Sequence, residues 1–128
     1  MKKKQTILPQ TKKTPEVVLD KSGIIRLSGR LIPENAEEFF NPVEVWINEY
    51  FCDPAPVTTL EFDLEYINSS GFRHMFYIVH KIINIRLLND PMRFRINWYY
   101  KPEDEDMLEK GKLLSQNLNV PFSFIMAG

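Results

Sequence analysis

Residues 57–87, VTTLEFDLEYINSSGFRHMFYIVHKIINIRL, decide the fold because the spacing of the hydrophobic residues changes within this stretch. At 57–67, apolar side chains alternate with polar ones, which is typical of a strand with one buried face. From Ser70, apolar residues recur every three or four positions until Asn89-Asp90-Pro91, the pattern of a long amphipathic helix. The stretch therefore predicts a strand followed directly by a helix.

The flanking segments repeat this alternation of strand and helix. Other elements expected from the same patterns are strands at 15–20, 24–31, 92–99 and 121–127, and a helix at 103–118 with acidic residues in its first turn. The predicted order is β-β-α-β-α-β-α-β. This order indicates an α/β fold with a five-stranded mixed, mostly parallel sheet and about three helices.

The segment that precedes residue 57 contains two possible helix starts. Asn35 is followed three residues later by Glu38, and Asn41 by Glu44, which are both capping-box patterns. Pro42 is tolerated at the first position of a helix but costs about 3 kcal/mol inside one. We therefore expect a short turn at 35–40 and a separate helix at 42–51.

Parallel strands linked by right-handed crossovers end at the same edge of a sheet. For this chain the expected strand ends are residues 31, 67 and 99. The segments LIPEN, NSSGFR and YYKPE, which follow these ends, are therefore expected to be neighbours. This edge is where open α/β sheets bind ligands and partners.

Composition and charge exclude several classes of protein. We expect one domain at 15–128 after a flexible basic tail at 1–14, which holds five lysines and no acidic residue. The rest of the chain has eleven basic and seventeen acidic residues, which argues against a nucleic-acid binder. A single cysteine, Cys52, leaves no disulfide within the chain and favours the cytoplasm. Neither a signal peptide nor a membrane-spanning segment is expected.

The sequence NSSG at 68–71 has two interpretations. Asn and Ser are standard N-cap residues, so Asn68 and Ser70 are expected to cap the following helix. Alternatively, one hydroxyl accepts a phosphate. A phosphate on Ser69 is tolerated at a helix N-terminus, where backbone N–H groups and the helix dipole favour an anion. The same charge placed in an interface with a partner costs about 2–5 kcal/mol. Phosphorylation there is therefore expected to switch binding without affecting folding.

No catalytic, cofactor or metal site is predicted. The two histidines, His74 and His80, are six residues apart and do not share a helix face. Glu61, Asp63 and Glu65 share one strand face and are expected to be exposed or charge-paired. Off the apolar stripe of the helix lie residues of types common at interfaces, namely Arg73, His74, Tyr77, Lys81 and Asn84.

Several short motifs resemble known regulatory proteins. Asn-Ser-Ser-Gly after a strand resembles the phosphorylation loop of STAS domains, the anti-sigma-factor antagonists, whose pattern is Asp-Ser-Ser-Gly-Leu-Gly. Here Asn68 replaces Asp, and Phe72-Arg73 replaces Leu-Gly. Over residues 14–128 the chain is more similar to the SiaC family of regulatory phosphoproteins, a STAS-like group. That similarity rests on IPEN at 32–35, FF…W…F in the next helix, LEYINSS at 64–70, NWYY at 97–100 and PFSF at 121–124.

This resemblance implies a non-enzymatic switch in the cytoplasm. Family members look like substrates of a dedicated kinase and a PP2C-type phosphatase, and the acceptor position corresponds to Ser69, with Ser70 as the alternative. In the best-known branch, the unphosphorylated form activates a diguanylate cyclase and so affects cyclic-di-GMP and biofilm formation. The residues expected to bind the partner are Glu34, Asn35, Asn68, Ser69, Ser70, Arg73, His74 and Tyr77.

Other functions remain open from the sequence. One is an anti-sigma-factor antagonist in a partner-switching pathway. Another is a small-molecule or lipid-binding module with an apolar groove under Phe39, Phe40 and Trp46. A third is an enzyme that uses His74 with Glu65 or Ser69. The chain is expected to be a monomer or a homodimer, the latter through Tyr99 and Tyr100.

Overall fold

The fold is an α/β structure with one sheet and one layer of helices. The structure is a computed structural model and describes residues 4–86 and 93–127. Its elements are β1 (Gln5–Leu8), β2 (Glu16–Asp20), β3 (Ile24–Leu31), α1 (Ala36–Tyr50), β4 (Thr58–Ile67), α2 (Ser69–Arg86), β5 (Phe94–Tyr100), α3 (Glu105–Leu118) and β6 (Ser123–Met126). The predicted mixed, mostly parallel sheet with three helices is confirmed.

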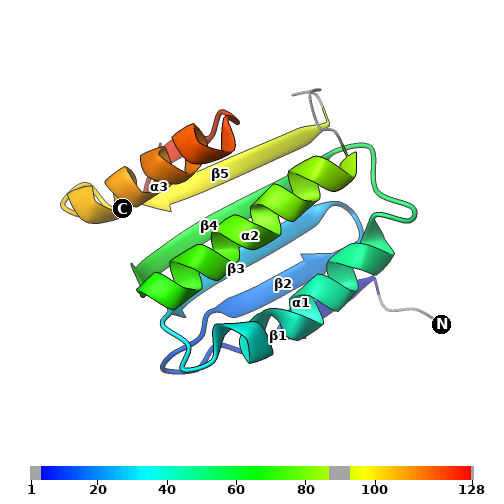
Figure 1. The fold of residues 1–128 in the computed structure, drawn as a ribbon, viewed down its shortest axis with the longest axis horizontal. Coiled ribbons are helices and arrows are strands. Elements are labelled where there is room, and N and C mark those ends of the chain that lie inside the picture. The colour runs from blue at the N-terminus through cyan, green and yellow to red at the C-terminus, as the bar shows by residue number, and fades with distance from the viewer. Residues whose placement is uncertain (1–3, 87–92, 128) are drawn as a thin grey trace.

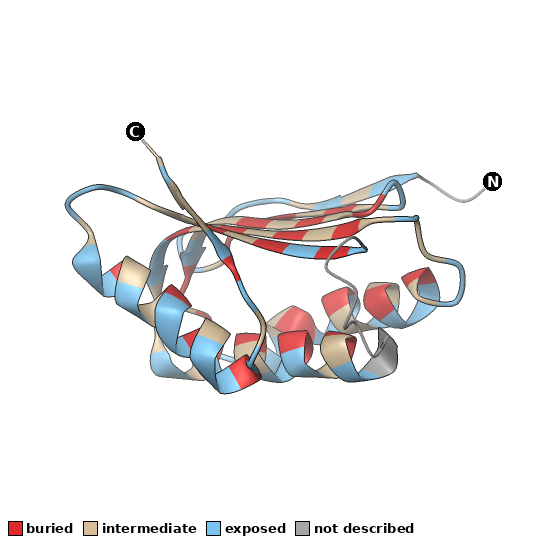
Figure 2. Cartoon of the chain, turned by 90° about the horizontal axis from the view of Figure 1, so that it is seen from above, coloured by how far each residue is buried: buried red, intermediate tan, exposed pale blue. Residues whose placement is uncertain are grey.

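The strands lie in the sheet in the same order as in the sequence, from β1 to β6. Pairs β1–β2 and β2–β3 are antiparallel, whereas β3, β4, β5 and β6 are parallel. Since each crossover from β3 onward moves one strand in the same direction, the helices all fall on one face (Figures 1 and 2). The parallel strands also end at a common edge, as expected.

The core fills the space between the sheet and the helices. Along β4, Leu60, Phe62 and Leu64 are buried, while Glu61 and Asp63 between them lie on the opposite face. Helix α2 contributes Met75, Val79 and Ile82 at steps of four and three residues, and α1 contributes Phe40, Val43 and Ile47. Figure 2 shows the buried residues gathered where the two layers meet.

The other face of the sheet carries a network of ion pairs. Arg26 lies 3.7 Å from the Glu61 carboxylate and 3.4 Å from that of Asp63. Arg30 lies 3.3 Å from Glu65. The Tyr99 hydroxyl donates to Glu61 at 2.6 Å, and this hydrogen bond, with burial, raises the pKa of Tyr99 above its ordinary value. The prediction that this row of carboxylates is charge-paired is therefore confirmed.

Strand β1 is a sixth strand that the sequence analysis missed. Residues 5–8 were assigned to a flexible tail, but they pair with β2 in the register Gln5 to Asp20 and Leu8 to Val17. The backbone of β2 provides this pairing, and Leu8 packs against the core. A four-residue strand with lysines on both sides has too little alternation to stand out in the sequence.

Helix α1 is continuous, so the predicted break before Pro42 is wrong. The Asn35 side chain caps it as expected and accepts from the Glu38 N–H at 3.0 Å. Pro42 lies inside the helix, where it removes the hydrogen bond to the carbonyl of Glu38. Both residues are exposed, so water can satisfy that carbonyl, while buried Phe40 and Val43 hold the helix against the core.

Helix α2 begins at Ser69, one residue before the expected start. Its predicted end at Asn89-Asp90-Pro91 lies outside the described residues. Within the described ranges, 4–86 and 93–127, no helix combines the length and the hydropathy needed to cross a bilayer.

Candidate functional site

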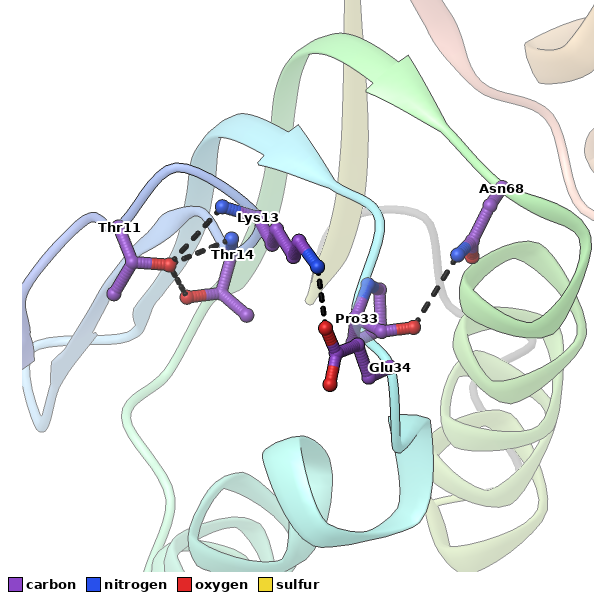
Figure 3. Close-up of polar contacts among 6 residues, drawn as sticks. All are labelled: Thr11, Lys13, Thr14, Pro33, Glu34 and Asn68. Carbon is purple, nitrogen blue, oxygen red and sulfur yellow. Dashed lines mark hydrogen bonds and ion pairs between the residues drawn. The ribbon is translucent and has the colours of Figure 1, made fainter.

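Asn68 joins the ends of β3 and β4 at the edge where the parallel strands finish. Its backbone N–H donates to the Leu31 carbonyl at 3.0 Å, and its Nδ2 donates to the Pro33 carbonyl at 3.3 Å. Figure 3 shows Asn68 facing Pro33 in the connection between β3 and α1. The predicted contact between LIPEN and NSSGFR is therefore confirmed.

The same asparagine caps helix α2. Its Oδ1 accepts from the Gly71 N–H at 2.8 Å and from the Ser70 hydroxyl at 3.3 Å. Gly71 is buried so closely that a Cβ there would lie 3.0 Å from the Leu31 carbonyl oxygen and 3.0 Å from Asn68 Oδ1. The capping interpretation of NSSG therefore holds for Asn68, Ser70 and Gly71.

Ser69 differs from its neighbours because its hydroxyl is not used in the cap. The residue is exposed in the first turn of α2. Among residues 4–86 and 93–127, no side-chain hydrogen bond engages its hydroxyl. Of the two adjacent serines, Ser69 is thus the one whose hydroxyl is available for modification.

On one side of α2, a hollow of about 490 Å³ separates this helix from α1. We call it the α1/α2 hollow; it is lined by Ala36, Glu37, Glu44, Ser70, Arg73, His74 and Tyr77. His74 Nε2 lies 2.9 Å from the Glu44 carboxylate, and Lys81 Nζ lies 3.9 Å from it. The His74 ring stacks on Phe40 with centroids 4.9 Å apart. In this hollow, Glu44 and His74 thus have partners within the chain, and the Ser70 hydroxyl donates to Asn68.

On the other side of α2, a groove of about 370 Å³ separates it from α3. We call it the α2/α3 groove; it is lined by Ile67, Asn68, Ser69, Phe72, Arg73, Lys110 and Leu113. Its exposed lining is mainly apolar, and Leu113 is 48% exposed. Arg73 and Lys110 have no carboxylate within ion-pairing distance among the described residues. The groove therefore combines an apolar surface with two unneutralised cations.

The eight residues expected to bind a partner are divided between the hollow, the groove and several structural contacts. Ser69 faces the groove, Ser70, His74 and Tyr77 face the hollow, and Arg73 lies between the two. The other three are used in structural contacts: Asn68 and Asn35 cap helices, and Glu34 forms an ion pair with Lys13 (Figure 3). This ion pair lowers the pKa of Glu34, through the hydrogen bond first and the ammonium charge second.

YYKPE lies elsewhere on the same edge. Tyr99, Tyr100, Lys101 and Glu103 line a separate hollow of about 440 Å³ together with residues 63–66 of β4. The segment lies beside Glu65 and Tyr66 near the end of β4 but lines neither the hollow nor the groove at α2, so the expected proximity of YYKPE to NSSGFR stays a prediction.

Glu65 and His74, one pair considered for an enzyme, lie on opposite faces of the sheet. Glu65 pairs with Arg30 on the open face of the sheet, whereas His74 pairs with Glu44 in the helix layer. Phe40 is 1% exposed, and the partly buried Phe39 and Trp46 pack against the core; none of the three lines the α1/α2 hollow or the α2/α3 groove. Within the described ranges, no group of three or more His, Cys, Asp or Glu side chains is arranged to bind a metal ion.

The sequence analysis missed Lys110 and Leu113, the two residues that α3 contributes to the groove. The spacing of residues in the predicted helix at 103–118 already indicated that both lie on its outer side. Leu113 and Leu114 are adjacent on a helix, so only one of them can face the core, and Leu114 is the buried one. Lys110 is three residues before Leu113 and therefore on the same side of α3.

Comparisons with known proteins agree with this architecture. The sequence model of a family described as "SiaC family regulatory phosphoprotein" matches residues 8–127. An uncharacterized protein of Pseudomonas aeruginosa strain UCBPP-PA14 is 26% identical over 117 residues, which is 91% of each chain.

The chain is also similar to solved structures of one protein. A crystal structure of diguanylate cyclase SiaD in complex with its activator SiaC, from Pseudomonas aeruginosa, contains a chain with a TM-score of 0.84 and 23% identity, covering 95% of this chain and 99% of that chain. Apo-SiaC from the same organism gives a TM-score of 0.78 at 22% identity, covering 97% and 98%. These similarities show a shared fold.

Proposed function

This chain belongs to the SiaC family of regulatory phosphoproteins, and on that premise we propose that phosphorylation of Ser69 switches its binding to an effector protein. A kinase would transfer the terminal phosphoryl group of a nucleoside triphosphate to Ser69 Oγ. The new Oγ–P bond forms as the bond to the leaving diphosphate breaks, and a base on the kinase accepts the hydroxyl proton. A PP2C-type phosphatase would hydrolyse the phosphate ester and restore the hydroxyl.

The observation that carries this proposal is the division of roles within NSSG. Asn68 and Gly71 form the cap and Ser70 donates to it, whereas the Ser69 hydroxyl is exposed and takes no part. A kinase can therefore reach this hydroxyl without unfolding the helix. A phosphate at this position lies beside the first N–H groups of α2, where an anion is favourable by about 0.3–1 kcal/mol.

Such a phosphate would act on binding and not on the fold. It adds a charge of about −1.5 to −2 at the rim of the α2/α3 groove. A partner surface that covers the groove must then bury this charge, which costs about 2–5 kcal/mol when it is left unpaired. The expected loss of affinity is at least about thirtyfold.

We propose that the effector is a diguanylate cyclase and that the protein itself is not catalytic. The fold match supports this choice, because SiaC of Pseudomonas aeruginosa is found in complex with the cyclase SiaD as its activator. The proposed activity is thus control of cyclic-di-GMP synthesis in the cytoplasm, with the unphosphorylated form as the activator.

The proposal is tested first by mass spectrometry of the protein purified from its own host. We expect a species one phosphate heavier, with the modification mapped to Ser69. In the same host, Ser69→Ala should prevent phosphorylation and raise cyclic-di-GMP, whereas the matched variant Ser70→Ala should still be phosphorylated at Ser69. A phosphate mapped to Ser70, or an unchanged cyclic-di-GMP level in Ser69→Ala cells, would count against the proposal.

A further inference from the structure

The α2/α3 groove holds two cations whose charge is not neutralised within the described part of the chain. Arg73 is exposed on α2 and Lys110 is half-buried on α3, and both line the groove together with Ser69. The residues that line the groove include no carboxylate. Two basic side chains on facing helices, beside an apolar surface, make a place where an anion can be held from both sides.

The α2 helix places Ser69 beside one of these cations. Ser69 and Arg73 are four residues apart on α2, so their Cβ atoms are neighbours on one helix face, about 5–6 Å apart. Lys110 approaches the same groove from α3. A phosphate on Ser69 Oγ extends from α2 into the space between the two cations.

Ser70, the adjacent hydroxyl, faces a different electrostatic environment. It lines the α1/α2 hollow with Glu37 and Glu44. In that hollow, the cationic Lys81 and the imidazole of His74 already contact Glu44. Arg73 also lines this hollow, so a phosphate on Ser70 would meet two carboxylates and one cation, whereas a phosphate on Ser69 would meet two cations and no carboxylate.

We propose that Arg73 and Lys110 form an intramolecular receptor for the phosphate on Ser69, which links α2 to α3 and closes the groove. The inference rests on the proposed function, because it requires that Ser69 be phosphorylated. A phosphate charge of about −1.5 to −2 offsets the two positive charges, so phosphorylation converts an open cationic groove into a bridged and nearly neutral one. An effector that uses this groove loses its apolar surface and both cations in one step.

The test is a ³¹P NMR titration of full-length protein in which phosphoserine is incorporated at position 69 during synthesis. Nearby cations stabilise the dianion, so the phosphoserine should titrate at lower pH than in the same chain unfolded in urea. In the double variant Arg73→Gln/Lys110→Gln, the midpoint should rise by about 0.5 pH unit or more. Lys112→Gln is the matched control, because Lys112 is exposed on α3, pairs with Glu109 and does not line the groove.

A second control moves the phosphate by one residue. Protein carrying phosphoserine at position 70 should titrate at higher pH than protein carrying it at position 69. Circular dichroism establishes that each protein is folded. The receptor is refuted if the double variant leaves the midpoint at position 69 unchanged, or if positions 69 and 70 titrate alike.

The outcome separates the receptor from the switch. Cyclic-di-GMP is measured in host cells that carry Arg73→Gln/Lys110→Gln or Ser69→Ala. If Ser69→Ala alters cyclic-di-GMP but the phosphate titration is independent of the two cations, the switch stands and the receptor fails. If the titration depends on them but Ser69→Ala has no effect in cells, the proposed function fails.

Discussion

The two sides of helix α2 differ in how completely their polar groups are used. In the α1/α2 hollow, Glu44 contacts both His74 and Lys81, and the His74 ring stacks on Phe40. In the α2/α3 groove, Arg73 and Lys110 lack carboxylate partners among the described residues, and Leu113 is 48% exposed. On the first side, the Glu44 carboxylate and the His74 ring are already engaged within the chain, and Tyr77 remains 53% exposed. The second is a surface that still has charge and apolar area to offer a partner.

This difference between the two sides of α2 gives two adjacent serines different surroundings. Successive residues of a helix point about 100° apart, so Ser69 lines the α2/α3 groove while Ser70 lines the α1/α2 hollow. Ser70 lines the α1/α2 hollow, and its hydroxyl donates to the Asn68 cap. Ser69 lines the α2/α3 groove, and its hydroxyl takes no part in the cap. A modification at Ser69 can therefore change binding while the packing of α2 on α1 stays intact.

The largest effect is expected where α3 meets the sheet. A Cβ at Gly111 would lie 2.5 Å from Nε1 of Trp98, which is fully buried and donates to the Met107 carbonyl at 2.9 Å. Gly111→Ala should therefore push α3 away and lower the free energy of unfolding by about 2–3 kcal/mol, even though alanine favours a helix. Urea denaturation measures the loss.

The matched control for Gly111→Ala is Lys112→Ala on the same helix. Lys112 is exposed, and its ion pair with Glu109 spans 3.8 Å, so its loss should change stability by no more than about 0.5 kcal/mol. Equal stability of the two variants would show that α3 can shift without cost. The groove would then not be a surface of fixed shape.

The next effect separates the capping residue from the proposed acceptor. Asn68→Ala removes the hydrogen bonds to Gly71 and Ser70 and the one to the Pro33 carbonyl, and should lower the free energy of unfolding by about 1–2 kcal/mol. Ser69→Ala should change it by less than about 0.5 kcal/mol, because that hydroxyl is exposed. If Ser69→Ala is as destabilising as Asn68→Ala, the Ser69 hydroxyl stabilises the fold. The proposed difference between Ser69 and Ser70 would then be wrong.

A smaller effect tests the two sides of α2 through adjacent residues. His74→Ala removes the stack on Phe40 and the contact with Glu44, and should lower the free energy of unfolding by about 1 kcal/mol. Arg73→Ala, one residue earlier, should leave it within about 0.5 kcal/mol. Thermal or urea denaturation of both variants measures the difference. If Arg73→Ala lowers the free energy of unfolding more than His74→Ala, the contacts on the groove side of α2 contribute more to stability than those on the hollow side.

Most of the sheet and the helices was predictable because their alternation is strong. Strand β4 places Leu60, Phe62 and Leu64 inside with acidic residues between them, and no other element type has this period. Pro42 misled the prediction because its cost inside a helix depends on exposure, which the sequence does not show. Strand β1 is held by pairing with β2 and has little pattern of its own.

The site was predictable to the residue only in part. Local chemistry identified Asn68 and Ser70 as capping residues, because capping is decided within one helical turn, whereas Ser69 as the phosphate acceptor stays a prediction. Lys110 reaches the groove by the packing of α3 on the sheet, which is a long-range contact. Glu34 as a partner-binding residue stays a prediction, and its ion pair with Lys13 from the β1–β2 connection is a contact that the sequence analysis did not predict. The common edge of parallel strands predicts which segments meet, as for Asn68 and Pro33, but not which side chains of distant segments pack together.

The smallest expected effect concerns the ion pair between Lys13 and Glu34. It tests whether the Glu34 carboxylate is held within the chain. The hydrogen bond and charge of Lys13 lower the pKa of Glu34, so its carboxyl group should titrate below the ordinary value of 4.5. Because the folded-state pKa is depressed, the pair contributes to stability above the pKa of the unfolded chain, and the contribution is lost as pH falls through the folded value. NMR titration of the Glu34 side-chain carboxyl should show the midpoint rise in Lys13→Gln but not in Lys12→Gln. An unchanged midpoint in Lys13→Gln would show that Lys13 does not hold the Glu34 carboxylate. Glu34, in the connection between β3 and α1, would then be available to a partner.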